Sequence, residues 1–154
     1  MNFNDVLKTK VADIERPPLL PVGTYKAVVK KIPSMETSGD GKWDFLDFQL
    51  GLIAAEEDVD ADALKEYGGL SAATIVRQRF MFNKEDDAAF KRTLFNVKRF
   101  LYDHLQIAGD DNSNLMEVLN QSVNSQCLVF MKWRADKNDA EIQYSEIGKT
   151  APIG

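Results

Sequence analysis

Residues 43–53 read WDFLDFQLGLI, and the alternation within this stretch decides the fold class. Side chains of an extended chain point to opposite faces in turn, so residues of one parity share a face. One parity holds only large apolar residues: Leu46, Phe48, Leu50 and Leu52. The other parity holds Trp43, Phe45, Asp47 and Gln49. The stretch therefore predicts a β-strand with one face in the core and a mixed aromatic and polar face outside.

Four further stretches carry strand signals, and they lie on both sides of this one. They are residues 23–32, 74–82, 126–135 and 141–147. The segment 33–42 is dense in turn formers and is expected to be a mobile loop. Residues 136–139, Asp-Lys-Asn-Asp, predict a hairpin turn between the last two strands.

One long helix is expected between the third and fourth of these strands. Its apolar residues recur at helical spacing: Phe90, Leu94, Val97, Leu101 and Leu105. Asn83 is the expected N-cap, and Gly109 is expected to end the helix. Shorter helices are predicted over 60–66 and 112–121.

The resulting order predicts an α+β fold, mostly β with helices. A five-stranded OB-like barrel with a long helix between strands 3 and 4 has this order. An unrelated α+β sheet has it too, so the order leaves that alternative open. The expected organisation is an N-terminal arm over 1–20, one OB-like domain over 21–150 with an acidic insertion at 54–70, and a tail over 151–154.

The formal net charge of −5 argues at first against a nucleic-acid-binding protein, because such domains are usually basic. However, residues 54–66 hold six acidic residues and one lysine, which accounts for the whole excess. The rest of the chain sums to zero. The objection therefore applies to one segment and not to the whole surface.

Several classes of protein are not expected from this composition. A single cysteine, Cys127, excludes an internal disulfide and fits a reducing compartment, and it is expected to pack as a small hydrophobe. With His104 as the only histidine, no structural zinc site is expected, and this histidine is expected to be structural. No apolar run is long enough to cross a membrane, and no secretion signal is expected. No catalytic motif, metal site or cofactor site is found, so we do not expect an enzyme.

Four residues of the second and third strands form the first candidate site. The polar parity would place Trp43 and Phe45 beside Arg77 and Arg79. Aromatic rings stack on bases, and arginines neutralise phosphates or stack themselves. The alternative is that Trp43 and Phe45 fill a second core beneath the arm, since aromatic pairs often lie in cores.

Two basic loops are expected to flank the same groove of such a barrel. The candidate nucleic-acid-binding residues of these loops are Lys30, Lys31, Lys42, Lys132, Trp133, Arg134 and Lys137. An ordinary solvated surface is the alternative, because scattered lysines are usually exposed.

Parts of the chain resemble phage-encoded single-stranded DNA-binding proteins of the OB-fold type. The resemblance lies in Leu-Pro-Val-Gly-Thr-Tyr at 20–25, followed by a lysine-rich strand, and in Arg-Phe-Met-Phe-Asn at 79–83. The long basic helix with Phe100-Leu101 and the closing Ile-Gly-Lys at 147–149 agree with it. The resemblance covers about residues 19–150.

This resemblance implies a non-enzymatic protein that coats single-stranded DNA during phage replication or recombination, in the cytoplasm of the infected bacterial host. It implies replication or recombination proteins as further partners and leaves a homo-oligomer open. Many such proteins end in an acidic tail, whereas this sequence ends Lys-Thr-Ala-Pro-Ile-Gly. We therefore hypothesise that residues 54–66 serve as an internal acidic element. The alternative function is a phage structural or accessory protein that binds protein partners and no nucleic acid.

Overall fold

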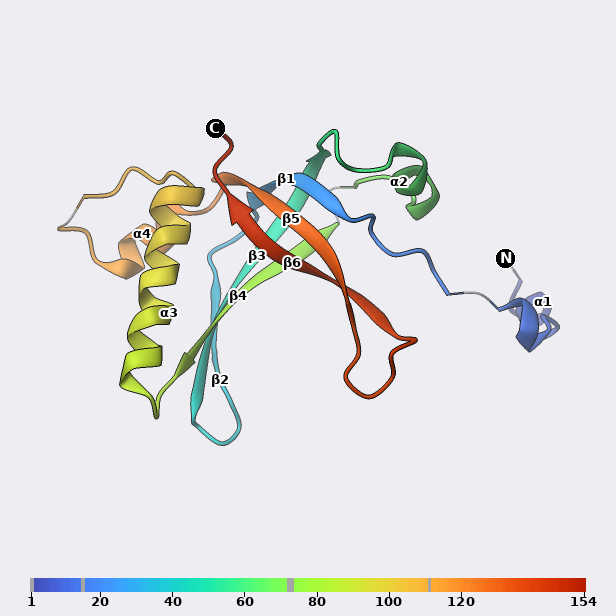
Figure 1. Ribbon diagram of the computed structural model, residues 1–154, viewed down its shortest axis with the longest axis horizontal. Helices are drawn as coiled ribbons and strands as arrows, with labels where there is room; N and C mark the ends of the chain where they lie inside the picture. The colour runs from blue at the N-terminus through green and yellow to red at the C-terminus, as the bar shows by residue number, and fades with distance from the viewer. Residues whose placement is uncertain (1, 15, 72–73, 111) are drawn as a thin grey trace.

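The computed structural model describes residues 2–14, 16–71, 74–110 and 112–154 (Figure 1). The strands are β1 (Gly23–Val29), β2 (Ser34–Thr37), β3 (Trp43–Ala55), β4 (Ile75–Asn83), β5 (Gln126–Ala135) and β6 (Gln143–Ala151). The helices are α1 (Phe3–Leu7), α2 (Ala61–Tyr67), α3 (Asp87–Arg99) and α4 (Leu115–Gln121). A 3-10 turn, η1 (Val11–Asp13), follows α1, and a π-helical turn, η2 (Phe100–His104), continues α3. The predicted α+β class is confirmed.

The six strands form one antiparallel sheet with β3 as its longest member. The strand order is β2-β3-β1-β5-β6, and β4 pairs with β3 outside this path. Along its first half β3 pairs with both β2 and β4, and along its second half it pairs with β1. This length lets one strand connect every part of the sheet except the β5–β6 hairpin.

Two expectations about the sheet are wrong or unconfirmed. The segment 33–42 is not only a loop, because it contains β2, which pairs Met35 with Leu46. The described residues therefore form six strands and not five. A four-residue edge strand with three exposed residues carries no alternating apolar signal. The barrel is also not confirmed, because β4 and β6 form no backbone ladder within the described ranges, so the sheet stays open there.

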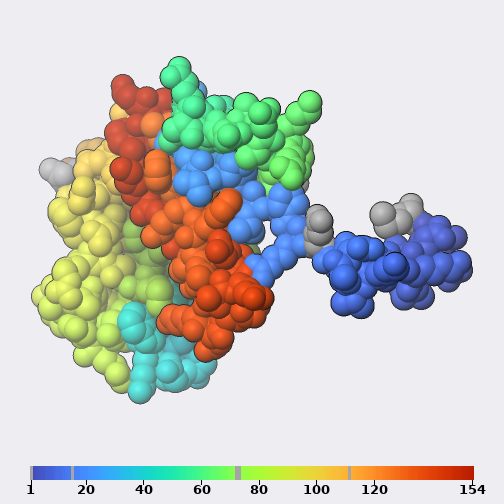
Figure 2. All heavy atoms as spheres, turned by 45° about the vertical axis from the view of Figure 1, so that its right-hand side comes forward, coloured from blue at the N-terminus to red at the C-terminus, as the bar shows by residue number. Residues whose placement is uncertain are grey.

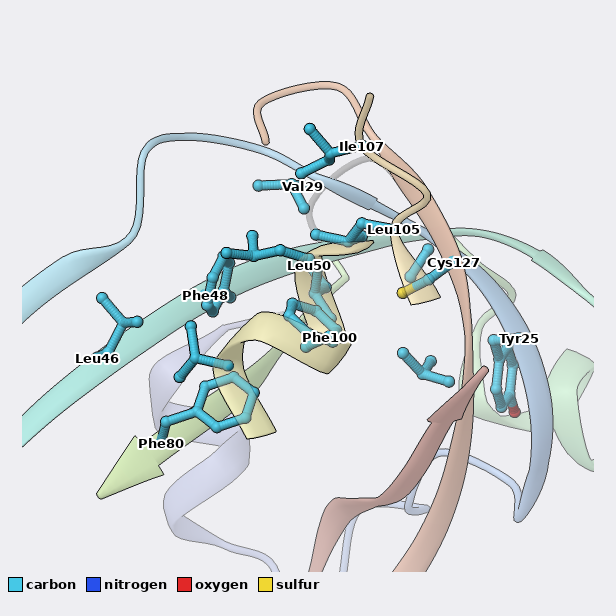
Figure 3. Packing of buried hydrophobic residues seen from close by; sticks show 14 of the residues in the cluster. Tyr25, Val29, Leu46, Phe48, Leu50, Phe80, Phe100, Leu105, Ile107 and Cys127 are labelled. Carbon is cyan, nitrogen blue, oxygen red and sulfur yellow. The ribbon is translucent and has the colours of Figure 1, made fainter. Parts of the chain in front are cut away.

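The core lies on the face of β3 that the alternation indicated. Leu46, Phe48, Leu50 and Leu52 are all at most 4% exposed. Phe48 meets Phe80 and Phe100 edge-on, with ring centroids 5.9 and 4.9 Å apart (Figure 3). Each such aromatic pair typically stabilises a fold by about 0.5–1.5 kcal/mol beyond area burial. Phe100 belongs to η2, so the continuation of helix α3 packs against the core face of the sheet.

Helix α3 begins later than its predicted cap. Asn83 is the last residue of β4, and Asp86 caps the helix by accepting a hydrogen bond from the Ala89 amide at 3.1 Å. Of the predicted apolar stripe, Val97 and Leu101 are fully buried, whereas Leu94 is 40% exposed. The predicted apolar stripe of the helix is therefore wider than the part of the helix that is buried.

The chain before β1 extends away from the body of the protein as an arm. Figures 1 and 2 show α1 and η1 standing apart from the sheet. Residues 2–14 are all exposed, and the first core residue along the described chain is Leu20. In the described parts of the chain, no helix has the length and apolar character needed to cross a bilayer.

Candidate nucleic-acid interface

The ladder between β3 and β4 brings the first candidate residues together. Opposed residues of an antiparallel ladder point to the same face of the sheet. The paired positions are Trp43 with Asn83, Phe45 with Met81, Asp47 with Arg79 and Gln49 with Arg77. We call this surface the β3–β4 outer face; it comprises Trp43, Phe45, Asp47, Arg77, Arg79 and Met81.

Asp47 organises the charges of the β3–β4 outer face. Its side chain is 6% exposed, and its Oδ2 lies 3.1 Å from Arg79 Nη2 and 3.6 Å from Arg77 Nη1. Its Oδ1 is buried and accepts no hydrogen bond within the described residues. The two arginines are more than 40% exposed. One buried carboxylate thus holds two guanidinium groups that remain open to solvent, which leaves a positive surface.

Phe45 lies directly beneath one of these arginines. The Arg79 guanidinium carbon is 5.0 Å from the centroid of the Phe45 ring, which is cation–π geometry. Phe45 and Trp43 are half-buried, and neither belongs to the core cluster. Helix α1 and the turn η1 do not cover them, because this part of the arm stands apart from the sheet (Figures 1 and 2). The second core beneath the arm, the alternative raised by the sequence, is therefore not formed.

Lys30 extends over the same surface from the end of β1. A Cβ atom built on Gly51 would overlap Lys30 Cε and approach Lys30 Cγ to 3.3 Å. Gly51 has the parity of Phe45 and Asp47, so the lysine stem crosses the outer side of β3 where a side chain is missing. Its amide also donates to the Gln49 carbonyl at 3.0 Å. The close approach of the Lys30 stem to Gly51 therefore adds a third cation to the outer side of β3.

The other two lysines of the first loop region, Lys31 and Lys42, are exposed. Lys31 lies between β1 and β2, and Lys42 lies in the turn just before β3. The Lys42 amide donates to Asp40 Oδ1 at 3.0 Å, which fixes the turn. Figures 1 and 2 place the β2–β3 and β5–β6 hairpins at the same end of the molecule, and exposed Lys137 lies in the second turn.

The structure separates the members of the Lys-Trp-Arg triplet. Lys132 and Arg134 share one face of the β5–β6 hairpin and both pair with Glu146, at 3.5 and 2.9 Å. Trp133 points to the other face, where its Nε1 donates to the Leu20 carbonyl at 2.7 Å. The ring stays 47% exposed. Trp133 is thus oriented by the base of the arm, and the two flanking cations lie on the opposite side.

A hollow of about 700 Å³ marks the open edge between β4 and β6. Arg77 and Val76 line it from β4, Ser145 and Ile147 line it from β6, and Leu20 closes it from the arm side. Arg77 therefore belongs both to this hollow and to the β3–β4 outer face. The hollow connects that face with Leu20, whose carbonyl accepts the Trp133 hydrogen bond, and the acidic residue Glu146 also lines it.

His104 and Cys127, the single histidine and the single cysteine of the sequence, are both expected to be structural. His104 Nδ1 and Thr150 Oγ1 are 2.6 Å apart, and burial, together with nearby Arg99, lowers the pKa of this histidine. Cys127 is fully buried in the core, and burial raises its pKa to about 12. Its thiol therefore stays protonated and acts as a small hydrophobe, as expected. Within the described ranges, no three ligand-type side chains gather in a way that would hold a metal ion.

Two contributions to this surface were missed by sequence reasoning. Asp47 was assigned to the outer parity, but its pairing with Arg77 and Arg79 depends on the β3–β4 register. A single acid facing two arginines of the next strand is the signal that could have indicated it. The alternation indicates Gly51 only as part of a strand, although glycine within a strand often marks a close approach of another group. Comparison with protein-family models and with curated proteins finds no match to this chain.

Proposed function

We propose that this protein binds single-stranded DNA with little sequence preference through the β3–β4 outer face. The observation that supports this most directly is the stack of Arg79 on Phe45, with Asp47 holding Arg79 and Arg77 in place. Aromatic rings and arginine planes both stack on bases, and exposed cations track phosphates. The function needs no catalytic residue, and we propose none.

In the proposed complex, bases stack on Phe45 and Trp43 while the backbone follows Arg79, Arg77 and Lys30. Arg79 and Arg77 oppose Asp47 and Gln49 of β3, and the Lys30 stem crosses β3 at Gly51. The hollow beside Arg77 continues the track toward Trp133. Lys31, Lys42 and Lys137 add positive charge at the two hairpin turns. Lys132 and Arg134 contribute least, because both pair with Glu146, which neutralises them.

We further propose that the open sheet is a variant of the OB-fold. Strands β1, β3 and β4 pair in succession, α3 follows, and β5 returns to pair with β1 before β6. This is the strand order of that barrel, with β2 as an added edge strand and the β4–β6 seam unpaired. The resemblance to phage single-stranded DNA-binding proteins supports a role in phage replication or recombination inside the infected bacterium.

The test is a fluorescence anisotropy titration with a labelled thymine oligonucleotide at several salt concentrations. We expect Phe45→Ala to weaken binding about 5- to 150-fold, since one stacked base is worth about 1–3 kcal/mol. Neutralising Lys30, Arg77 and Arg79 together should lower the slope of log affinity against log salt by about 2, because each phosphate contact on a single strand contributes about 0.7.

Tyr144→Ala is the matched control. Its ring is 44% exposed and, like that of Phe45, lies beneath an arginine, with Arg134 at 5.8 Å, but on the hairpin face that carries Glu146. We expect this variant to bind like the unmodified protein. Absence of binding at low salt would reject the proposed function. Equal losses for Phe45→Ala and Tyr144→Ala would reject the proposed surface.

A further inference from the structure

The hollow at the open edge between β4 and β6, which we call the β4–β6 hollow, combines an apolar floor with a polar rim. Its volume of about 700 Å³ lies in the range of small-ligand pockets, about 300–1,000 Å³. Its floor consists of apolar side chains that belong to the core or pack against it: Leu20, Val76, Met131 and Ile147. Tyr67 of α2 lines it as well. A flat apolar ring would find apolar partners on several sides here.

The charged groups of the rim leave it positive. Arg77 lines the rim with a side chain that is 62% exposed, and it shares the Asp47 carboxylate with a second arginine. The acidic residue of the rim is Glu146, which pairs with Lys132 and Arg134 at 3.5 and 2.9 Å. Each carboxylate therefore faces two cations. A phosphate beside Arg77 would meet no uncompensated acid among these groups.

The β4–β6 hollow is continuous with the β3–β4 outer face through Arg77. This arginine opposes Gln49 in the β3–β4 ladder and also lines the hollow. At the other side lies Trp133, which opposes Ser145 in the β5–β6 ladder and donates to the Leu20 carbonyl at 2.7 Å. Ser145 and Leu20 both line the hollow. A DNA backbone that follows Arg77 therefore runs beside the opening.

Strand pairing leaves the two edges of the hollow unjoined. In the described parts of the chain, β4 pairs with β3 and β6 pairs with β5, and no ladder joins β4 to β6. The facing edges thus carry backbone N–H and C=O groups that no ladder across the gap uses. The edges of nucleobases carry donors and acceptors as well, whereas their faces are apolar enough to stack. The hollow therefore suits a nucleobase better than an aliphatic ligand.

We propose that the β4–β6 hollow takes one unstacked base of the bound single-stranded DNA, while the phosphate of that nucleotide lies at Arg77. This inference rests on the proposed function and adds a base beyond those stacked on Phe45 and Trp43. The ring packs on the apolar floor, and its edge meets the backbone edges of β4 and β6. Bases of a single strand are free to splay out in this way. The hollow then adds affinity without adding a phosphate contact.

The experiment fills the hollow and measures DNA affinity. Ser145→Phe fills it from β6 and Val76→Phe fills it from β4, and phenylalanine is well accepted in strands. Ser113→Phe is the matched control, because Ser113 lines a different hollow, of about 460 Å³, beside α3 and α4. Urea unfolding followed by circular dichroism identifies the variants that fold. Anisotropy titrations with a labelled thymine oligonucleotide at several salt concentrations then give the affinity of each.

We expect Ser145→Phe and Val76→Phe to weaken binding about 5- to 150-fold, the range for the loss of one bound base. The slope of log affinity against log salt should not change, because no phosphate contact is lost. Ser113→Phe should bind like the unmodified protein. The inference is overturned if a folded filling variant binds like the unmodified protein. It is also overturned if the loss comes with a lower salt slope, because the variant would then act by displacing Arg77.

Photocrosslinking with thiothymine in the same oligonucleotide locates the base directly. We expect a crosslink to Tyr67 or Met131 that Ser145→Phe abolishes, whereas crosslinks confined to Trp43 and Phe45 would overturn the inference and leave the proposed function intact. Weaker binding of Phe45→Ala together with normal binding of both filling variants has the same meaning. Absence of DNA binding by the unmodified protein at low salt would reject the proposed function and this inference together.

Discussion

At the scale of single residues, Asp47 determines how much positive charge the β3–β4 outer face carries. Its buried carboxylate accepts contacts from two exposed arginines, so it orients them and at the same time cancels part of their charge. A phosphate that binds either arginine must approach this anion, and like charges repel. Asp47 is therefore expected to limit the affinity of the face that it organises.

The substitution Asp47→Asn tests this role. Asparagine keeps the shape and an acceptor oxygen but removes the negative charge, so we expect binding to single-stranded DNA to tighten several-fold, with a steeper salt dependence. Asp44→Asn is the control, because Asp44 lies three residues before Asp47, on the other parity of β3, and pairs with Lys84 at 3.1 Å. Affinity is measured by anisotropy titration. Weaker binding of Asp47→Asn would mean that orientation of the arginines matters more than their charge.

Residue types and strand parity predicted the members of this face, but not their contacts. Trp43, Phe45, Arg77 and Arg79 were placed on one side of two strands from alternation alone, and the ladder confirms that placement. The ion pairs and the Arg79–Phe45 stack depend on which residue opposes which. A shift of the register by two residues would keep every parity and break each of these contacts.

At the scale of elements, the cap at Asp86 determines where α3 begins. Asp86 accepts a hydrogen bond from the Ala89 amide and lies at the positive end of the helix dipole. The sequence predicted a cap at Asn83, but β4 continues through that residue because it pairs with Trp43. Strand pairing therefore delayed the helix by three residues.

We expect Asp86→Ala to lower the free energy of unfolding by about 1 kcal/mol, the usual cost of losing an N-cap. Asp86→Asn should cost far less, because asparagine caps helices about as well as aspartate. Urea unfolding followed by circular dichroism measures both. Equal losses for the two variants would mean that the charge, and not the capping hydrogen bond, stabilises this end of α3.

The strands differ in how readily the sequence predicts them. Strand β5 was predicted with its observed bounds, because its buried positions alternate with more exposed ones. Strand β2 was missed, because its four residues lie at an edge and gain stability only from pairing with β3. The sequence suggests one basic cluster at 132–134. Alternation in a strand, however, places the central tryptophan on the face opposite both cations.

At the scale of the whole molecule, the acidic segment has a structural part and a purely electrostatic part. Asp58 accepts hydrogen bonds from the amide and hydroxyl of Thr24 at 2.8–3.1 Å, and these bonds lower its pKa. Asp60 caps α2 through the Ala63 amide at 2.9 Å. Removal of the entire segment would therefore also damage the start of β1, and substitution of the other acids is the better test.

Replacement of Glu56, Glu57 and Glu66 by glutamine and of Asp62 by asparagine changes the formal net charge from −5 to −1. We expect a clear gain in DNA affinity at low salt, and a gain of less than about twofold at physiological salt, where the Debye length is only about 8 Å. Anisotropy titrations at both ionic strengths measure this. A gain of about tenfold that persists at physiological salt would instead identify the segment as a local brake on binding.

The sequence by itself determined the fold class, the core face of β3 and the parity of the β3–β4 outer face, because alternation and helical spacing are local properties of the chain. Tertiary structure alone decided the Asp47 ion pairs, the path of Lys30 over Gly51 and the open β4–β6 edge. Each of these depends on long-range register or on relative placement. Such features are set by packing between distant segments, which no local pattern encodes.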